Sequence, residues 1–361
     1  MLRMDYAGRQ KRFQRTLNEQ KLDGFVVTHA ANLRYLCGYT GSNGLLLFLD
    51  GKRVFFTDGR YTEQAREEVK GARVVIPGGA LLAGAAKFLA KRMAAHIGFE
   101  ADVTTVAGAM QMKRLAPKGI LWKATSGLIM RQRMIKDAEE LRLIREAVNL
   151  GAKAYEEAAQ AIRPGVSEIE VAGRLEFAAR RAGAEGMSFE TIVAAGKRGA
   201  LPHGRASVQS IPKRGFVLVD SGVILRGYCS DMTRTVHVGR IGRVERKWYE
   251  SVLEAQLVGI ATVRPGVAAA EVDEAVRSVL RKAKLDKYFA HSTGHGVGLE
   301  IHEPPRLGSN QTERLETGMV VTIEPGIYIP DKGGIRIEDM VVVTEKGCEV
   351  LTPVTKELVE V

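Results

Sequence analysis

Short apolar runs of strand length alternate with helical patterns over the first part of the chain. These runs recur between Gly24 and Lys123, and Asp58-Gly59 marks a turn before one of the helical stretches. The predicted strands cover residues 24–28, 45–49, 54–57, 74–76, 97–99 and 120–123, and the predicted helices cover 60–69, 81–93 and 104–115. The alternation predicts a small α/β domain of roughly 125 residues.

A longer helical pattern follows this region. Residues 129–138 are rich in charge and lead into residues 139–161, where Leu141, Ile144 and Val148 recur at helical spacing. The length of 361 residues also favours more than one domain. We therefore predict two domains, residues 1–128 and residues 129–361.

The second domain contains an internal repeat. The motif Arg163-Pro164-Gly165-Val166 returns 101 residues later, at positions 264–267, and each copy lies between two helical patterns. The segments that begin at Gly215 and Gly318 are also alike, because each is an apolar strand that ends on a carboxylate. Two similar halves, each with helices followed by a strand pair, predict an α+β domain with pseudo-twofold symmetry.

Composition narrows the class of protein. Hydrophobic residues make up 45% of the chain and charged residues 26%, which is typical of a globular protein. Because no apolar run reaches 18 residues and the amino terminus lacks a signal-peptide core, we expect a cytoplasmic protein with no membrane partner. The net charge is +11, but the basic residues are scattered, so no nucleic-acid partner is expected. Three distant cysteines support neither a disulfide framework nor a zinc knuckle.

The histidine-rich stretch from His291 to Glu303 is the first candidate for chemistry. It holds His291, His295 and His302, three of the seven histidines in the chain, among small and apolar residues. A single histidine is often only a hydrogen-bonded structural residue. A cluster that has carboxylate partners is more typical of a metal site or of acid–base chemistry.

Carboxylates occur at matching places in both halves of the repeat. The strand that carries Asp220 is predicted to form a hairpin with the strand that carries Asp231, and a turn centred between Leu225 and Arg226 would place the two side chains opposite each other. In the second half, Glu324 and Glu338 flank a turn in the same way. Opposed carboxylates in an apolar hairpin are unfavourable unless a cation lies between them.

An oxygen-rich set with one imidazole therefore emerges as a candidate metal site. Such a set suits manganese, and the imidazole also admits cobalt, iron or zinc. If some carboxylates bridge, the set can hold two divalent ions, which can activate a water molecule for hydrolysis. The set consists of Asp220, Asp231, His295, Glu324 and Glu338.

The stretch from His291 to Glu303 resembles the signature of the proline-specific aminopeptidase and prolidase group, within the pita-bread metallopeptidases. The segments at Asn32–Leu36, Gly41–Gly44 and Asp58–Tyr61 resemble the creatinase-type amino-terminal domain. The resemblance implies an α+β pita-bread catalytic domain after a smaller α/β creatinase-like domain, and a homodimer.

The resemblance also implies roles for individual residues. Asp220 would bind one ion, His295 and Glu324 would bind the other, and Asp231 and Glu338 would bridge them. Glu324 would also take up a proton during catalysis. The second set of expected roles concerns the substrate: His203 and His302 would act in catalysis, and His291, Tyr328 and Arg336 would bind the substrate.

The expected reaction is hydrolysis of the peptide bond between an amino-terminal residue and proline. Of two enzymes with this site, the sequence favours aminopeptidase P, which accepts longer peptides, over its alternative, prolidase, which acts on dipeptides. The compact amino-terminal domain supports that preference, whereas Arg306 or Arg336 could clamp a dipeptide carboxylate and support prolidase. A non-catalytic pita-bread binding module is disfavoured, because all five ligand positions are filled.

Overall fold

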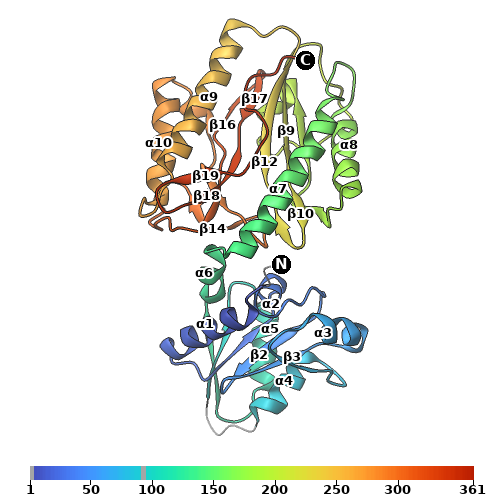
Figure 1. The fold of residues 1–361 in the computed structure, drawn as a ribbon, viewed down its shortest axis with the longest axis vertical. Coiled ribbons are helices and arrows are strands. Elements are labelled where there is room, and N and C mark those ends of the chain that lie inside the picture. The colour runs from blue at the N-terminus through green and yellow to red at the C-terminus, as the bar shows by residue number, and fades with distance from the viewer. Residues whose placement is uncertain (1–3, 91–94) are drawn as a thin grey trace. The chain divides into compact units, whose positions relative to one another are not determined.

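The computed structural model describes residues 4–90 and 95–361. The chain divides into two compact units, Met1–Arg133 and Met134–Val361. The boundary predicted between residues 128 and 129 falls at the start of the short helix α6 (Leu128–Met134), whereas the compact units divide near its end (Figure 1). Within the described residues, no helix is both long and apolar enough to cross a membrane.

The first unit is built on a six-stranded mixed sheet in the order β4-β3-β2-β1-β5-β6. The strands β1, β2 and β3 form an antiparallel meander, and the remaining neighbours pair in parallel. The buried core on one face combines aliphatic and aromatic side chains of the strands with the apolar faces of α4 and α5. The strands are β1 (Gly24–Val27), β2 (Leu45–Leu49), β3 (Lys52–Phe56), β4 (Arg73–Val75), β5 (Ala95–Glu100) and β6 (Ile120–Thr125).

The α/β pattern predicted for this region is confirmed, although the sequence pattern did not mark the first two helices. Helix α1 begins where the Asp5 carboxylate accepts a hydrogen bond from the Gly8 amide, 2.8 Å away. The helix predicted over 81–93 is described as far as Leu89, and residues 91–94 lie outside the described residues. The helices are α1 (Tyr6–Glu19), α2 (Ala30–Cys37), η1 (Gly59–Tyr61), α3 (Thr62–Glu68), α4 (Leu81–Leu89) and α5 (Val106–Leu115).

In the second unit, two pairs of helices enclose curved antiparallel strands. Helices α7 and α8 lie on one side and α9 and α10 on the other, with β9, β12, β16 and β17 between them (Figure 1). The helical elements of this unit are α7 (Ala138–Ala159), α8 (Glu168–Arg181), η2 (Gly196–Ala200), α9 (Arg243–Thr262), α10 (Ala269–Lys282) and η3 (Asp286–Tyr288).

The strands of the second unit also divide between its two halves. In the first half β9 pairs with β8 and β12, and in the second half β15 pairs with β13 and β18. The strands are β7 (Gly186–Met187), β8 (Ile192–Ala195), β9 (Gly215–Ser221), β10 (Val223–Leu225), β11 (Tyr228–Cys229), β12 (Met232–Val238), β13 (Gly294–Gly296), β14 (Glu303–Leu307), β15 (Val320–Ile323), β16 (Gly326–Ile329), β17 (Gly333–Arg336), β18 (Asp339–Val343) and β19 (Cys348–Val350).

The repeated Arg-Pro-Gly-Val motifs adopt the same structure in both halves. Gly165 and Gly266 have φ values of +87° and +85°, which glycine adopts without a steric penalty. The Gly165 amide donates to the carbonyl of Ile211 at 2.9 Å, and the Gly266 amide donates to that of Leu315 at 2.8 Å. The predicted internal symmetry is therefore present in the backbone, down to equivalent hydrogen bonds.

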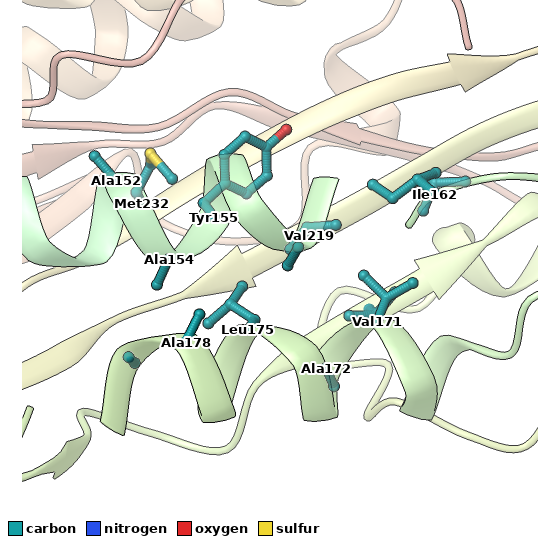
Figure 2. Close-up of a cluster of buried hydrophobic side chains, with 14 of the residues drawn as sticks. Ala152, Ala154, Tyr155, Ile162, Val171, Ala172, Leu175, Ala178, Val219 and Met232 are labelled. Atoms are coloured by element: carbon teal, nitrogen blue, oxygen red, sulfur yellow. The ribbon is translucent and has the colours of Figure 1, made fainter. Parts of the chain in front are cut away.

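Small side chains allow the paired helices to pack closely. Figure 2 shows Ala154 of α7 and Ala178 of α8 on facing surfaces, with Leu175 of α8 also between the helices, whereas Tyr155 points from α7 away from α8. These side chains are at most 6% exposed. The core fixes the strands that carry the carboxylates, because Val219 of β9 belongs to the same cluster.

The hairpin of the first half has a different register from the predicted one. Asp220 lies opposite Thr233, and the turn is formed by Arg226 and Gly227, whose φ values are 49° and 78°. The expectation that Asp220 and Asp231 face each other directly is therefore wrong by two residues. A shift of two leaves each side chain on its original face of the strand pair, so the two carboxylates still point toward the same region.

Candidate metal centre and active site

All five predicted metal ligands line one cavity of about 740 Å³ in the second unit. Asp231, His295 and Glu338 lie closest, since each offers one ligand atom within 4.8 Å of the others. Asp220 is the last but one residue of β9, and Glu324 directly follows β15. The predicted residues His203, His291, His302 and Arg336 also line the cavity, whereas Tyr328 is not part of its wall.

His295 presents one ring nitrogen to the carboxylates. Its Nδ1 atom lies 3.0 Å from the carbonyl of Gly296, which assigns the N–H to Nδ1. The Nε2 atom is then free of a proton and lies 3.5 Å from Asp231 Oδ2 and 3.4 Å from Glu324 Oε1. Burial lowers the pKa of His295 to about 4, so the ring is neutral near pH 7, as a metal ligand must be.

Hydroxyl groups orient two of the carboxylates. Thr233 donates to Glu338 Oε2 at 2.6 Å, and Thr322 donates to Glu324 Oε1 at 3.2 Å. Thr322 Oγ1 also accepts a hydrogen bond from the His295 amide at 3.0 Å. Both threonines lie on strands, and no sequence motif marks them.

Asp220 has one oxygen with a partner and one without. Its Oδ2 atom accepts from Arg336 Nη2 at 2.5 Å, whereas its buried Oδ1 atom has no hydrogen-bond partner among the described residues. A buried carboxylate oxygen normally finds a donor or a cation. The second oxygen of Asp220 therefore fits the ligand of a metal ion.

The four carboxylates repel one another in a buried site. Burial, together with Glu338, Asp220 and Glu324, raises the pKa of Asp231, and burial combined with neighbouring carboxylates likewise raises that of Glu338. Burial raises the pKa of Glu324 to about 8. The residues present fit divalent cations, because positive charge placed among them would offset both the repulsion and the cost of burial.

A chain of hydrogen bonds links three predicted substrate-side residues. The Tyr328 hydroxyl lies 2.7 Å from His291 Nε2 and 2.6 Å from Arg336 Nη1. His291 Nδ1 faces the Ser292 carbonyl at 2.8 Å, so Nε2 accepts from Tyr328, and Tyr328 accepts from Arg336. Burial raises the pKa of Tyr328 to about 12, which keeps the hydroxyl protonated as a donor.

The Tyr328→Phe variant is expected to lower the free energy of unfolding by about 1–3 kcal/mol, because it removes the donor to the partly buried His291 Nε2 and one of the acceptors of the buried Arg336 guanidinium. Urea denaturation measures the effect. Tyr288→Phe, at a half-buried ring in η3, is the matched control. Equal losses in the two variants would show that the hydroxyl of Tyr328 has no special role.

Two further buried carboxylates hold the loops that carry histidines. Glu168 of α8 accepts from Ser207 Oγ at 2.6 Å and from Arg198 Nε at 2.9 Å, and so fixes both ends of the loop that carries His203. Asp273 of α10 accepts from Thr293 Oγ1 at 2.8 Å and from Arg277 Nε at 2.8 Å.

The Asp273 network reaches the histidine stretch directly. Arg277 also donates to the carbonyl of His291, at 2.5 Å. Neither Glu168 nor Asp273 was found from the sequence, because an acidic residue on a helix gives no signal that it is buried.

Two protein families match the sequence of this chain. Residues 142–345 match metallopeptidase family M24, and residues 9–135 match the creatinase/prolidase N-terminal domain. The chain belongs to metallopeptidase family M24. The predicted fold class, a creatinase-like α/β domain followed by a pita-bread catalytic domain, is thereby confirmed. Membership also implies metal ions in the catalytic unit, without identifying them.

Three known proteins are similar to this chain over about two thirds of its length or more. The structure of an Xaa-Pro dipeptidase from Bacillus anthracis superposes with a TM-score of 0.94 and 40% identity, over 99% of this chain and 100% of that one. An X-Pro aminopeptidase from Thermotoga maritima MSB8 gives a TM-score of 0.90 and 33% identity, over 97% and 100%. The Xaa-Pro dipeptidase of Pyrococcus furiosus is 44% identical over 237 residues, which are 66% of this chain and 68% of that one.

Proposed function

We propose that the chain is a metal-dependent Xaa-Pro dipeptidase, which hydrolyses the bond between an amino-terminal residue and a carboxy-terminal proline. The observation that carries the proposal is full-length similarity to the Bacillus anthracis dipeptidase, at 40% identity and a TM-score of 0.94. The sequence alone favoured aminopeptidase P. The comparisons support its alternative, prolidase, better, although an aminopeptidase is also among the similar structures.

The proposed metal site uses the five residues predicted from the sequence. Asp220 would hold one ion, and His295 and Glu324 the other, with Asp231 and Glu338 shared between them. Manganese is the expected metal, with cobalt, zinc or iron as alternatives. Ions bound there would supply an activated water molecule and polarise the scissile carbonyl.

The side chains of the protein would bind the substrate and move protons. Glu324 would accept the proton of the attacking water molecule and release it to the leaving nitrogen of proline. His302 and His203 line the same cavity and would donate hydrogen bonds to the developing oxyanion. His291, held by Tyr328, would form the wall beside the substrate.

Arg306 is our candidate for recognising the substrate carboxylate. Arg336 is buried, and its donors are engaged by Asp220, Tyr328 and the Pro202 carbonyl. Arg306 is exposed, lines the cavity and lies opposite His295 in the β13–β14 pair. Its Nε atom donates to Ser292 Oγ at 3.3 Å, and a guanidinium at an exposed position can bind a carboxylate through two parallel hydrogen bonds.

The Arg306→Met variant is expected to raise KM for Ala-Pro by about 10- to 100-fold, because a charge-assisted hydrogen-bonded pair is lost. The effect on the amide Ala-Pro-NH₂, which has no carboxylate, is expected to be small. Arg174→Met, at an exposed position of α8, is the matched control. An equal rise in KM for acid and amide would rule out Arg306 as the clamp.

Substrate length tests the proposed function itself. Wild-type protein supplied with manganese is expected to hydrolyse Ala-Pro and to leave Ala-Pro-Ala intact. Faster cleavage of the tripeptide would show an aminopeptidase P, and no metal binding with no turnover would favour a non-catalytic binding module. The homodimer and the cytoplasmic location stay predictions, which sedimentation and cell fractionation can test.

A further inference from the structure

Lys136 and Glu303 form a buried ion pair beside the cavity. The Nζ atom of Lys136 lies 3.2 Å from Glu303 Oε2, and each side chain is only 1% exposed. Lys136 belongs to the connection between α6 and α7, whereas Glu303 begins β14, so the pair joins segments 167 residues apart. Because desolvation of both groups offsets their attraction, such a pair adds little stability relative to an apolar one. Its place in the structure therefore points to a role other than stability.

The carboxylate of Glu303 shapes the loop that precedes β14. Its Oε1 atom accepts a hydrogen bond from the Glu300 amide at 3.2 Å. A Cβ atom added to Gly298 would come within 2.6 Å of the carboxylate, so the loop backbone packs directly against it. The loop is also tied to β11, because the Cys229 amide donates to the Gly298 carbonyl at 2.8 Å.

His302 is the residue immediately before Glu303, and it lies next to the candidate metal ligand His295. The two rings meet edge to face, with centroids 4.4 Å apart. The register of β13 and β14 shifts between His295 and Gly296, because Gly296 pairs with Glu303 while His295 pairs with Arg306. Strand β14 begins at Glu303, directly after His302, and the register shift lies beside this start. The position of His302 therefore depends on where β14 begins.

We propose that Lys136 and Glu303 are positioning residues, whose buried ion pair fixes the start of β14 and thereby orients His302 toward the substrate. The kinetic part rests on the proposed peptidase function, and the structural part does not. Lys136 contributes from a fixed backbone, since its amide donates to the Gly318 carbonyl at 3.0 Å. The ion pair thus connects the segment that precedes α7 with the loop between His295 and His302.

Charge neutralisation separates positioning from stability. Lys136→Met and Glu303→Gln each remove one member of the buried ion pair and leave the charge of the other in place, and both single variants are expected to melt well below wild type. The double variant removes both charges, so its melting temperature is expected to return close to that of wild type. With Ala-Pro, its kcat is still expected to be about 100-fold lower, with little change in KM, because His302 is displaced from the reacting group.

A matched control changes the same residue types at an exposed turn of the second unit. The Glu345→Gln/Lys346→Met variant is expected to keep the wild-type melting temperature and kcat. If the double variant at Lys136 and Glu303 also kept the wild-type kcat, the pair would have no positioning role. A double variant as unstable as the single ones would overturn the inference as well, since the pair would then be structural.

Crystal structures of the wild type and the double variant test the inference without any turnover. The His302 ring is expected to move by about 1 Å or more relative to His295 in the double variant, while the fold is retained. An unmoved ring would overturn the inference. A wild type that cleaves no Xaa-Pro substrate would refute the proposed function, yet displacement of the ring would still support the positioning role.

Discussion

The Asp231→Asn variant is expected to lose peptidase activity by about 10³-fold or more, while its metal-free form melts at least as high as metal-free wild type. Asparagine keeps the shape of aspartate but is a weaker metal ligand without charge. Asp231 lies at the centre of the carboxylate cluster, where burial and three other acidic groups raise its pKa. Neutralising it relieves repulsion in the metal-free protein, so loss of activity is not accompanied by loss of stability.

Metal content, kcat and melting temperature together check this prediction. Asp331→Asn is the matched control, because Asp331 is exposed in the β16–β17 turn and has a φ of 60°, which asparagine tolerates. The control is expected to bind metal and to turn over as wild type does. An active Asp231→Asn enzyme with full metal content would refute the shared-ligand role of Asp231.

Removal of divalent ions with a chelator is expected to abolish activity and to make stability fall as the pH rises. Burial raises the folded-state pKa of Glu324 from the usual 4.5 to about 8. Between these values the folded protein holds a proton that the unfolded chain has released, so raising the pH favours unfolding. Metal-free protein is therefore expected to melt about 5 °C or more lower at pH 8 than at pH 5.5.

Bound ions are expected to reverse this trend, because they replace the protons and bind the ionised carboxylates. Thermal melts with chelator or with manganese, at both pH values, make the comparison. The Glu324→Gln variant serves as the control, since it lacks one of the titrating groups and its metal-free form should show a weaker dependence on pH. A metal-free wild type that is more stable at pH 8 would contradict the predicted electrostatics.

Local sequence patterns were sufficient to predict the fold class and to predict that the four carboxylates lie in one site. The repeat placed Asp220 and Glu324 at equivalent strand ends, and strand geometry then brought Asp231 and Glu338 to the same cavity. The register of the first hairpin was misjudged, because the sequence does not reveal that Arg226 and Gly227 both adopt positive φ. The two-residue error did not affect the predicted site, because a shift of two residues keeps each side chain on the same face of the strand.

Side-chain contacts between segments far apart in the chain could not be predicted from the sequence. Nothing near Lys136 or Glu303 in the sequence indicates that they meet, and Glu168 looks like any acidic residue in the first turn of a helix. The choice between dipeptidase and aminopeptidase was also beyond local reasoning, because both enzymes share the same ligands and differ in how the far end of the substrate is recognised. Similarity over the whole chain supports the dipeptidase, and Arg306 is the residue proposed to recognise the substrate carboxylate.

The pseudo-twofold arrangement divides the candidate ligands between two halves of the second unit. Asp220 and Asp231 come from the first half, and His295, Glu324 and Glu338 from the second. An ion that contacts both sets would act as a cross-link between segments more than sixty residues apart in the sequence, such as those of Asp231 and His295. Cross-links of that span restrict the unfolded chain, so the catalytic metal would also serve as a clasp that holds the two halves of the fold together.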